Sequence, residues 1–349
     1  MTGRPGAARD AARDPRVARL RERPGHADGA VARAHGLAPL RDARDADVAE
    51  LAASLAETPR RIPSKYFYDA AGSRLFERIC ELPEYYPTRT ELAIMRAQAA
   101  RMAAALGPGV VLVEYGSGAS LKTRLLLAAL DAPRAYVPVD VSASALDGAV
   151  ARLAAEFPAL AIEPVCADFT RPFAFPAAVT SAAPRVVYFP GSTIGNFTGD
   201  EARELLAQMR ELAGARGMAL VGADLRKDPA VLLAAYDDAA GVTAEFNLNL
   251  LANVDREFGL GLDVTAFRHR APWNDAAGRI EMHLVAMRDQ RASLAGRTYA
   301  IAAGDYLLTE YSHKYRLDEF RALAARAGWR ARRVWTDERA WFSVHLLEA

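Results

Sequence analysis

The segment 110–130 constrains the fold more than any other part of the sequence. Residues 110–115 form an apolar, β-branched run, which is typical of a buried strand. The run ends in the glycine-rich turn 116–120, and 121–130 then has the periodicity of a helix. A strand, a glycine turn and a helix in this order predict the first unit of a parallel α/β sheet.

The same alternation continues along the chain. It predicts strands at 135–140, 162–166, 185–189 and 218–223, and helices near 143–157 and 200–213. We therefore expect an α/β fold with a doubly wound parallel sheet that helices cover on both faces. Two more strands, at 330–335 and 342–347, are expected to close the sheet. Ligands of such sheets bind at the carboxyl ends of the strands.

An inserted element interrupts this alternation after Asp224. Strands are expected at 258–270 and 279–288, as an antiparallel pair. Period-two alternation in the second strand places Glu281 and His283 on one face, and Met282 and its apolar neighbours on the other. A Glu281 that points inward must meet either an internal arginine or a cation-like ligand. His283 is expected to pair with Glu281, to reach a substrate or to lie at the sheet surface.

The composition excludes several classes of protein. The 349 residues carry 44 basic and 43 acidic side chains, so the chain lacks the basic domain of a nucleic-acid binder. No apolar run approaches the ~20 residues that span a membrane. The two isolated cysteines suggest no disulfide framework, the histidines have no metal-ligand spacing, and we expect a cytoplasmic protein without metal. Residues 1–45 hold ten arginines and six acids, which predicts a disordered basic tail.

The glycine turn favours a cationic nucleoside ligand. Leu121 stands where the dinucleotide fingerprint needs a glycine or alanine, so a pyrophosphate is disfavoured. Glu114, just before the turn, is expected to place a negative charge near the ligand. Asp140 and Asp168 end the next two strands, where they suit ribose hydroxyls and an adenine amino group. S-adenosylmethionine, with its sulfonium and ribose, meets these conditions.

Six motifs identify a family. The chain contains Lys65-Tyr66-Phe67-Tyr68-Asp69, Leu82-Pro83-Glu84-Tyr85-Tyr86-Pro87-Thr88-Arg89, Gly116-Ser117-Gly118-Ala119-Ser120-Leu121-Lys122-Thr123, Gly191-Ser192-Thr193-Ile194-Gly195-Asn196-Phe197, Tyr236-Asp237-Asp238-Ala239-Ala240-Gly241-Val242-Thr243 and Arg279-Ile280-Glu281-Met282. In this order they closely resemble the L-histidine Nα-methyltransferases of ergothioneine biosynthesis. The resemblance extends from about residue 63 to the C-terminus. The same family includes a fungal N-methyltransferase that acts on a prenylated tryptophan.

The resemblance implies an architecture and a set of site residues. It implies a class I (Rossmann-like) methyltransferase core at 91–225 and 289–349, and a smaller α+β substrate-binding domain at 46–90 and 226–288. The cofactor-binding residues are expected to be Gly116, Lys122, Asp140, Asp168 and Phe169. Tyr85 and Asn196 would hold the carboxylate of the amino acid, Tyr68 and Thr243 its α-amino group, Tyr236 would border the substrate, and Glu281 would bind the imidazole. His283 departs from one member of the family, in which a small hydroxyl residue at this position helps to bind the imidazole.

The implied reaction is methyl transfer to an amine. The expected activity is trimethylation of the α-amino group of L-histidine to hercynine by a monomer, with three molecules of S-adenosylmethionine. One alternative keeps the chemistry but changes the amino acid, to tryptophan or a derivative. The others are a dinucleotide oxidoreductase, which Leu121 disfavours, and a silent binding protein, which would be expected to lack some of Tyr68, Asn196 and Glu281. All three are present.

Overall fold

The computed structural model describes residues 40–117, 121–179 and 183–349. Residues Asp45–Ala349 form one compact unit. Most of the predicted tail at 1–45 lies outside the described residues, but 40–45 belong to α2 (Leu40–Ala56). Within the described ranges, no helix combines the length and the apolar character that a membrane crossing requires.

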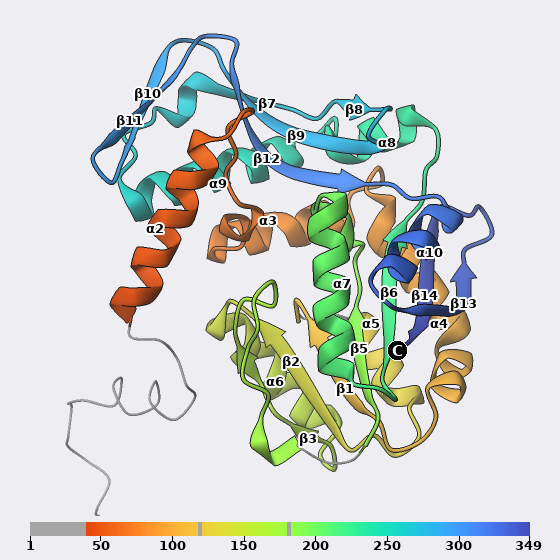
Figure 1. Cartoon of the computed structure of the whole chain (residues 1–349). Helices are drawn as coiled ribbons and strands as arrows, with labels where there is room; N and C mark the ends of the chain where they lie inside the picture. Colours follow the sequence, from red (N-terminus) through yellow and green to blue (C-terminus); the bar gives the residue numbers. More distant parts are fainter. Residues whose placement is uncertain (1–39, 118–120, 180–182) are drawn as a thin grey trace, which may run out of the picture. The chain divides into compact units, whose positions relative to one another are not determined.

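The larger sheet confirms the predicted doubly wound α/β architecture (Figure 1). Among the residues that the structure describes, it has eight strands in the order β13-β14-β6-β5-β1-β2-β3, and β4 also pairs with β2. The neighbours among β6, β5, β1, β2 and β3 pair in parallel, and so do β2 and β4. By contrast, β14 is antiparallel to both of its neighbours, β6 and β13. They are β1 (Val111–Tyr115), β2 (Ala135–Asp140), β3 (Ala161–Ile162), β4 (Val165–Cys166), β5 (Arg185–Phe189), β6 (Met218–Asp224), β13 (Arg330–Thr336) and β14 (Phe342–Glu348).

Helices cover both faces of this sheet. Val111 and Val113 of β1 contribute to a core with α7 (Gly199–Ala213) and α10 (Leu317–Arg326). Leu112, between them, points to the opposite face and joins a core with α4 (Tyr86–Leu106), α5 (Leu121–Ala129) and α6 (Ala143–Glu156). Because both of their faces are buried, the central strands β1, β2, β5 and β6 are mostly apolar. Figure 1 shows α7 lying along one face.

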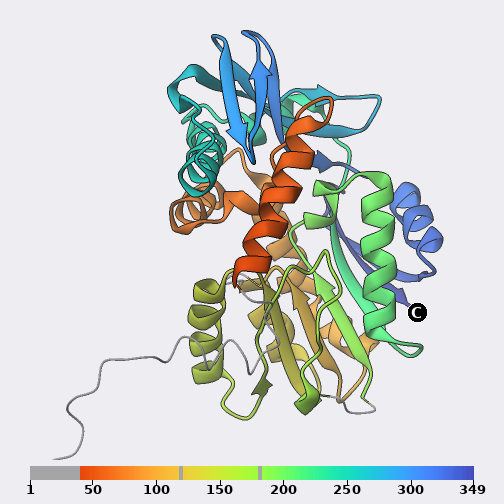
Figure 2. The ribbon, with the colours of Figure 1, turned by 60° about the vertical axis from the view of Figure 1, so that its left-hand side comes forward.

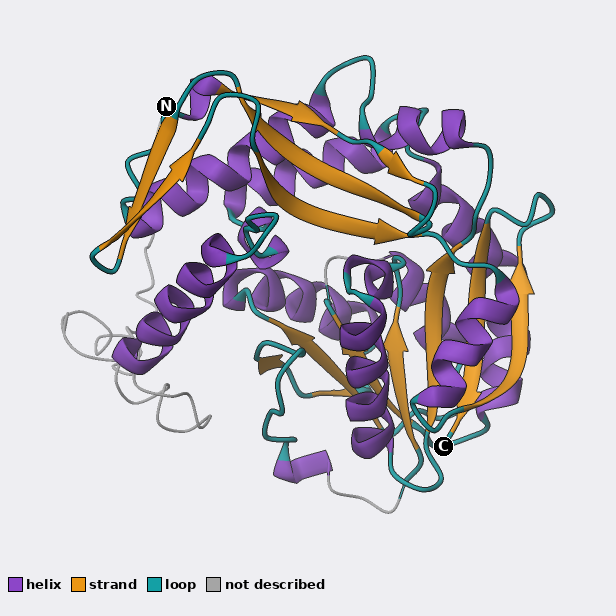
Figure 3. Ribbon diagram, turned by 45° about the horizontal axis from the view of Figure 1, so that its top comes forward, coloured by secondary structure: helices purple, strands orange, loops and turns teal. Residues whose placement is uncertain are grey.

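A smaller antiparallel sheet follows the order β12-β9-β7, with β8 pairing with β9 (Figure 3). Its strands are β7 (Phe267–Arg270), β8 (Trp273–Asn274), β9 (Arg279–Ala286) and β12 (Tyr306–His313). The hairpin of β10 (Gln290–Leu294) and β11 (Arg297–Ile301) extends from it (Figure 2). The other elements are η1 (Ser64–Phe67), α3 (Ala70–Glu81), η2 (Ala177–Val179), η3 (Thr193–Asn196), α8 (Pro229–Tyr236), α9 (Val242–Phe258) and η4 (Val264–Ala266).

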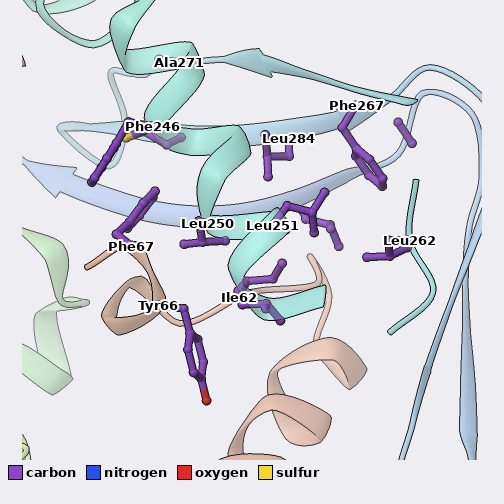
Figure 4. Packing of buried hydrophobic residues seen from close by; sticks show 14 of the residues in the cluster. Ile62, Tyr66, Phe67, Phe246, Leu250, Leu251, Leu262, Phe267, Ala271 and Leu284 are labelled. Carbon is purple, nitrogen blue, oxygen red and sulfur yellow. The ribbon is translucent and has the colours of Figure 1, made fainter. Parts of the chain in front are cut away.

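Aromatic stacking contributes to the core beneath the smaller sheet. The rings of Phe67 and Phe246 stack with centroids 4.3 Å apart (Figure 4). Leu250, Leu251 and Leu284 belong to the same buried cluster. This core joins η1 to α9 and β9, so the segment around residue 67 is held against the smaller sheet.

The pairing of β12 bears on where the substrate-binding part of the chain ends. Strand β12 pairs with β9 from Tyr306 to His313. Residues 290–313 therefore lie with the smaller sheet instead of with the core. The pairing joins segments about twenty residues apart across the β10–β11 hairpin, and no local pattern indicated it.

Two predicted strands are shorter than expected. Helix α9 extends to Phe258 and ends at Gly259, which adopts a φ of +67°, so β7 begins only at Phe267. The predicted strand at 162–166 is divided into β3 and β4. Pro164 lies between them and has no N–H group to donate to a neighbouring strand.

Candidate active site

The turn after β1 is shaped by Gly116. This glycine has a φ of +73°, and its N–H donates to the carbonyl of Val139. A Cβ at this position would lie 3.8 Å from Cε1 of Phe169. The backbone of the turn is therefore open beside an aromatic face. Residues 118–120 of the predicted glycine turn lie outside the described residues.

Glu114 has a structural role that the sequence did not indicate. Its carboxylate accepts hydrogen bonds from Thr123 Oγ1, at 2.6 Å, and from the hydroxyl of Tyr136. Burial raises the pKa of Glu114 to about 7. The side chain therefore ties α5 to β1 and β2 inside the fold.

The predicted cofactor carboxylates lie at neighbouring strand ends. Asp140 pairs with Cys166 in the register of β2 and β4, so Asp168 follows two residues beyond this pair. Asp140 Oδ1 accepts the N–H of Ser142 at 2.9 Å, and burial raises the pKa of Asp140. Asp168 Oδ1 accepts the N–H of Thr170 at 2.9 Å, which fixes the turn that carries the next residue, Phe169.

Phe169 completes this group. Its ring stacks against Tyr115 at a centroid distance of 5.3 Å, next to Gly116. The structure thus brings together a glycine turn, an aromatic face and two carboxylates at the ends of adjacent strands. A nucleoside needs an apolar surface for its base and acceptors for its hydroxyl and amino groups, so this set fits S-adenosylmethionine.

Lys122 links the glycine turn to the loop after β5. Its Nζ lies 2.6 Å from Oε2 of Glu91, on α4. The same carboxylate oxygen accepts the N–H of Gly191 at 2.9 Å. Lys122 therefore lies at the predicted cofactor edge, but its ammonium is held by Glu91.

Asn196 and Glu310 connect the two sheets. Asn196 ends η3 in the loop after β5, and its Nδ2 donates to Oε1 of Glu310, on β12, at 2.9 Å. Burial raises the pKa of Glu310 to about 7, while Lys314 opposes the rise. Glu310 keeps part of its surface accessible. It is therefore a carboxylate that is held by one amide and can accept a further hydrogen bond.

Of the three predicted tyrosines, Tyr68 and Tyr85 lie within electrostatic reach of Glu310, and Tyr236 contacts Tyr85. The rings of Tyr85 and Tyr236 meet edge to face, with centroids 6.1 Å apart. Burial raises the pKa of Tyr68, and the carboxylates of Glu310 and Asp140 raise it further. The hydroxyl of Tyr68 therefore lies within electrostatic reach of both the substrate side and the cofactor side.

Tyr236 belongs to a hydrogen-bonded charge network. Its hydroxyl lies 2.7 Å from Ser312 Oγ and accepts from Lys314 Nζ at 2.8 Å. Lys314 also pairs with Asp224, at the end of β6, at 2.8 Å. Lys227 binds the other oxygen of Asp224 at 2.6 Å. The network thus fixes Tyr236 between the end of the core strand β6 and the segment that follows β12.

Thr243 lies at the start of α9. Its backbone N–H donates to Oδ1 of Asp238 at 2.8 Å, and its side chain is buried. None of the hydrogen bonds in the described part of the chain joins Thr243 to Asn196 or Glu310. The structure therefore places Thr243 as a helix-end residue, and its predicted contact with an α-amino group remains a prediction.

The strand register places Glu281 and His283 together, as the alternation predicted, but on a different face from Glu310. In the β9–β12 pair, Glu281 lies opposite Tyr311, whereas Glu310 lies opposite Met282. Directly opposed residues share one face of a sheet. Glu281 and His283 therefore project to the face opposite the one that carries Glu310.

The partners of Glu281 agree with this register. Its Oε1 accepts from Arg279 Nε at 2.8 Å and from Asn274 Nδ2 at 3.0 Å, and Oε2 lies 3.3 Å from His283 Nε2. Although burial opposes the effect, Arg279 and Asn274 hold the pKa of Glu281 below its ordinary value. Of the two alternatives for Glu281, the internal arginine is correct. His283 pairs with Glu281 and stacks on Tyr306.

Glu310, Ser312 and Lys314 were not among the predicted site residues, and the structure places them in contact with Asn196 and Tyr236. They alternate along β12 and the residue that follows it, so they share one face. The signal was available in Glu310-Tyr311-Ser312-His313-Lys314, where period two separates these three polar side chains from the intervening aromatic residues.

The arrangement defines the class of protein. Strand β14 is antiparallel and lies between β6 and β13, a glycine turn follows β1, one carboxylate ends β2 and another follows β4. This is a class I methyltransferase that uses S-adenosylmethionine. In the ranges that the structure describes, no group of three or more metal-ligating side chains is found.

Comparison with known proteins gives the family. A family model described as histidine-specific, SAM-dependent methyltransferase matches residues 47–349. The chain belongs to this family.

Curated relatives are similar over most of the chain. A histidine N-alpha-methyltransferase of Mycolicibacterium smegmatis is 44% identical, covering 85% of this chain and 93% of the relative. One from Mycobacterium tuberculosis is 42% identical, covering 84% and 91%. The ergothioneine biosynthesis protein 1 of Neurospora crassa is 30% identical over 83% of this chain and 33% of its own length.

Proposed function

We propose that the protein transfers methyl groups from S-adenosylmethionine to the α-amino nitrogen of L-histidine. Three transfers give hercynine, for ergothioneine biosynthesis. Family membership and the names of the relatives support methyl transfer to histidine. The observation that carries the substrate assignment is the pair of Glu310 and Ser312, two residues apart on one face of β12.

This pair matches a neutral imidazole. One ring nitrogen carries a proton and the other a lone pair, so the ring needs one acceptor and one donor. The carboxylate of Glu310 accepts from the N–H, and the hydroxyl of Ser312 donates to the bare nitrogen. Glu310 therefore replaces Glu281 in the role first expected from the sequence.

The remaining site residues hold the amino acid end. Asn196 uses one amide proton for Glu310, and the second remains for the substrate carboxylate, together with the hydroxyl of Tyr85. Tyr68 and Thr243 are proposed to orient the α-amino group. Because the pKa of Tyr68 is raised by burial, its hydroxyl stays protonated and binds the amine as a neutral group.

The chemistry requires positioning more than an acid or a metal. S-adenosylmethionine supplies an electrophilic methyl group when it is bound by Gly116, Asp140, Asp168 and Phe169. The side chains around the amine aim its lone pair, and such orientation supplies up to ~7–11 kcal/mol. The α-ammonium first loses a proton, which Tyr68 or water can pass outward.

We also propose which parts of the chain bind the substrate and which bind the cofactor. Residues 46–90 and 226–313 bind the substrate, and 91–225 with 314–349 bind the cofactor. Both cysteines are free, which is compatible with a cytoplasmic enzyme. We expect it to act as a monomer.

Methyl transfer from labelled S-adenosylmethionine to each of the twenty amino acids tests this function. Mass spectrometry should show mono-, di- and trimethylated histidine. Transfer to tryptophan, with none to histidine, would overturn the proposal in favour of the alternative. No transfer to any amino acid would overturn both.

A further inference from the structure

Lys314 is a wholly buried lysine whose three protons are all engaged. Its side chain is 0% exposed. The ammonium lies 2.8 Å from Asp224 Oδ2, 2.8 Å from the hydroxyl of Tyr236 and 2.7 Å from Ser312 Oγ. An ammonium has three donors and no acceptor, so each of these oxygens receives one proton.

The charge of Lys314 is stabilised within the network. Although burial opposes the effect, Asp224 and Tyr236 hold the pKa of Lys314 above its ordinary value. Asp224 also binds Lys227, so it remains paired when Lys314 is replaced. The next carboxylate along the same strand face is Glu310, whose raised pKa Lys314 lowers.

The hydrogen-bond directions around Tyr236 and Ser312 follow from this count. The two hydroxyl oxygens lie 2.7 Å apart and share one proton between them. Each oxygen already accepts from Lys314. A phenol is the better donor and a serine the better acceptor, so Tyr236 donates to Ser312. The proton of Ser312 is then left to donate outward, on the face that also carries Glu310.

We propose that Lys314 is a positioning residue that makes Ser312 a hydrogen-bond donor and thereby selects substrate rings that carry a bare nitrogen. This inference rests on the proposed function. Neutral imidazole offers the required acceptor beside the N–H that Glu310 binds. Indole offers only an N–H, and imidazolium offers two, so each leaves the donor of Ser312 without a partner.

Substitution by methionine separates this role from a purely structural one. In Lys314→Met the hydroxyls of Tyr236 and Ser312 each lose the hydrogen bond that they accept from Lys314. The direction of the hydrogen bond between the two hydroxyls is then no longer fixed, and Ser312 can donate to Tyr236. We measure the affinity of the protein, saturated with S-adenosylhomocysteine, for histidine and for β-(2-thienyl)alanine, whose ring has no nitrogen. The preference of the wild-type protein for histidine should fall about tenfold in Lys314→Met.

Two controls accompany this variant. Lys227→Met removes the other lysine of Asp224, which contacts neither Tyr236 nor Ser312, and it should keep the wild-type preference whatever its stability. In a Ser312→Ala background, Lys314→Met should not change the preference further, because the residue through which it acts is missing. If Lys314→Met does not fold, Lys314→Gln, which keeps a donor for Asp224, replaces it.

The outcomes distinguish this inference from the proposed function. A wild-type protein that binds histidine no better than thienylalanine contradicts both. If the wild-type protein discriminates and the Lys314 variants discriminate equally well, only the inference about Lys314 fails. An equal loss of preference in Lys227→Met would also overturn it, since the effect would then follow from the charge network in general.

Discussion

Asn196 Nδ2 lies 2.9 Å from Oε1 of Glu310, and this hydrogen bond joins the loop after β5 to the smaller sheet. The first residue follows a strand of the cofactor core, and the second lies on β12. The bond therefore fixes the amide that is proposed to hold the substrate carboxylate relative to the carboxylate that is proposed to hold the ring.

Replacement of Glu310 tests the substrate assignment. Glu310→Gln exchanges an anionic acceptor for a neutral amide, so the KM for histidine should rise by about ten- to a hundredfold. Glu281→Gln is the matched control, because it makes the same change on the opposite face of the sheet. Steady-state kinetics should show a much smaller effect for it. If Glu281→Gln raised the KM for histidine as much as Glu310→Gln does, the result would favour the expectation from the sequence that Glu281 binds the imidazole.

The pH dependence of stability should carry the signature of Glu310. Its pKa is raised to about 7 in the folded protein, whereas an unfolded glutamate titrates near 4.3. Between these values only the folded chain binds this proton, so the free energy of unfolding of the ligand-free protein falls as pH rises from about 4.5 to 7. Glu310→Gln should remove about 1–3 kcal/mol of this fall.

Urea unfolding of both proteins at pH 5 and pH 7.5 measures this effect. Glu114, whose pKa is also raised to about 7, contributes the same trend to both proteins and cancels in the difference. Parallel pH profiles of the wild-type protein and Glu310→Gln would show that Glu310 has an ordinary pKa.

Replacement of Asp140 should affect the binding of the cofactor alone. Asp140→Asn removes the carboxylate at the end of β2, and the affinity for S-adenosylhomocysteine should fall by about ten- to a hundredfold. Asp147→Asn makes the same change at an exposed position of α6. Calorimetry should find an unchanged affinity for that control. Equal affinities for the two variants would remove the ribose assignment.

Glu91 should stabilise both the fold and the cofactor edge. Its side chain is 1% exposed and holds Lys122 and the N–H of Gly191. Glu91→Gln leaves a largely buried ammonium without its counter-charge, so we expect a loss of about 3 kcal/mol in the free energy of unfolding. The affinity for S-adenosylhomocysteine should fall as well, because α5 and the loop after β5 are no longer joined.

An exposed ion pair provides the control for Glu91. Glu245→Gln disrupts the pair between Arg78 and Glu245, in which both side chains are more than half exposed. Such pairs contribute about 0–1 kcal/mol. Denaturant unfolding that gives similar losses for the two variants would contradict the buried role of Glu91.

Phe67→Ala should destabilise the part of the chain that carries Tyr68. Phe67 is buried and stacks on Phe246, so its truncation should cost about 3–5 kcal/mol. Leu233→Ala, at a residue that is 38% exposed, should change the free energy of unfolding by less than about 0.5 kcal/mol. Thermal unfolding that shows equal shifts would mean that the stack contributes little.

Local patterns predicted the parallel sheet because its strands obey local rules. Each strand is a short apolar run followed by a turn and a helix, and parallel pairing places the strand ends together. Gly116 and Asp140 could therefore be assigned to one edge before the structure was known. Pro164, which divides the predicted third strand, is also a local signal, but the strand prediction did not take it into account.

Local sequence patterns could not predict which face of the smaller sheet lies toward the proposed substrate site. Glu281 and Glu310 lie in strands of similar alternation, and each is flanked by a polar residue two positions away. Alternation separates the two faces of one strand, but it does not say which face a second strand shares. Only the register of β9 and β12, which opposes Glu310 to Met282, decides this.

The sequence by itself determined the class of fold, the cofactor edge and the family, because strand-turn-helix units and long motifs are local. The tertiary structure decided which glutamate lies beside Asn196, and it brought Lys314 to Tyr236 across 78 residues of chain. The physical reason is that a hydrogen bond between distant segments depends on pairing and burial, and neither is encoded in the neighbours of a single residue.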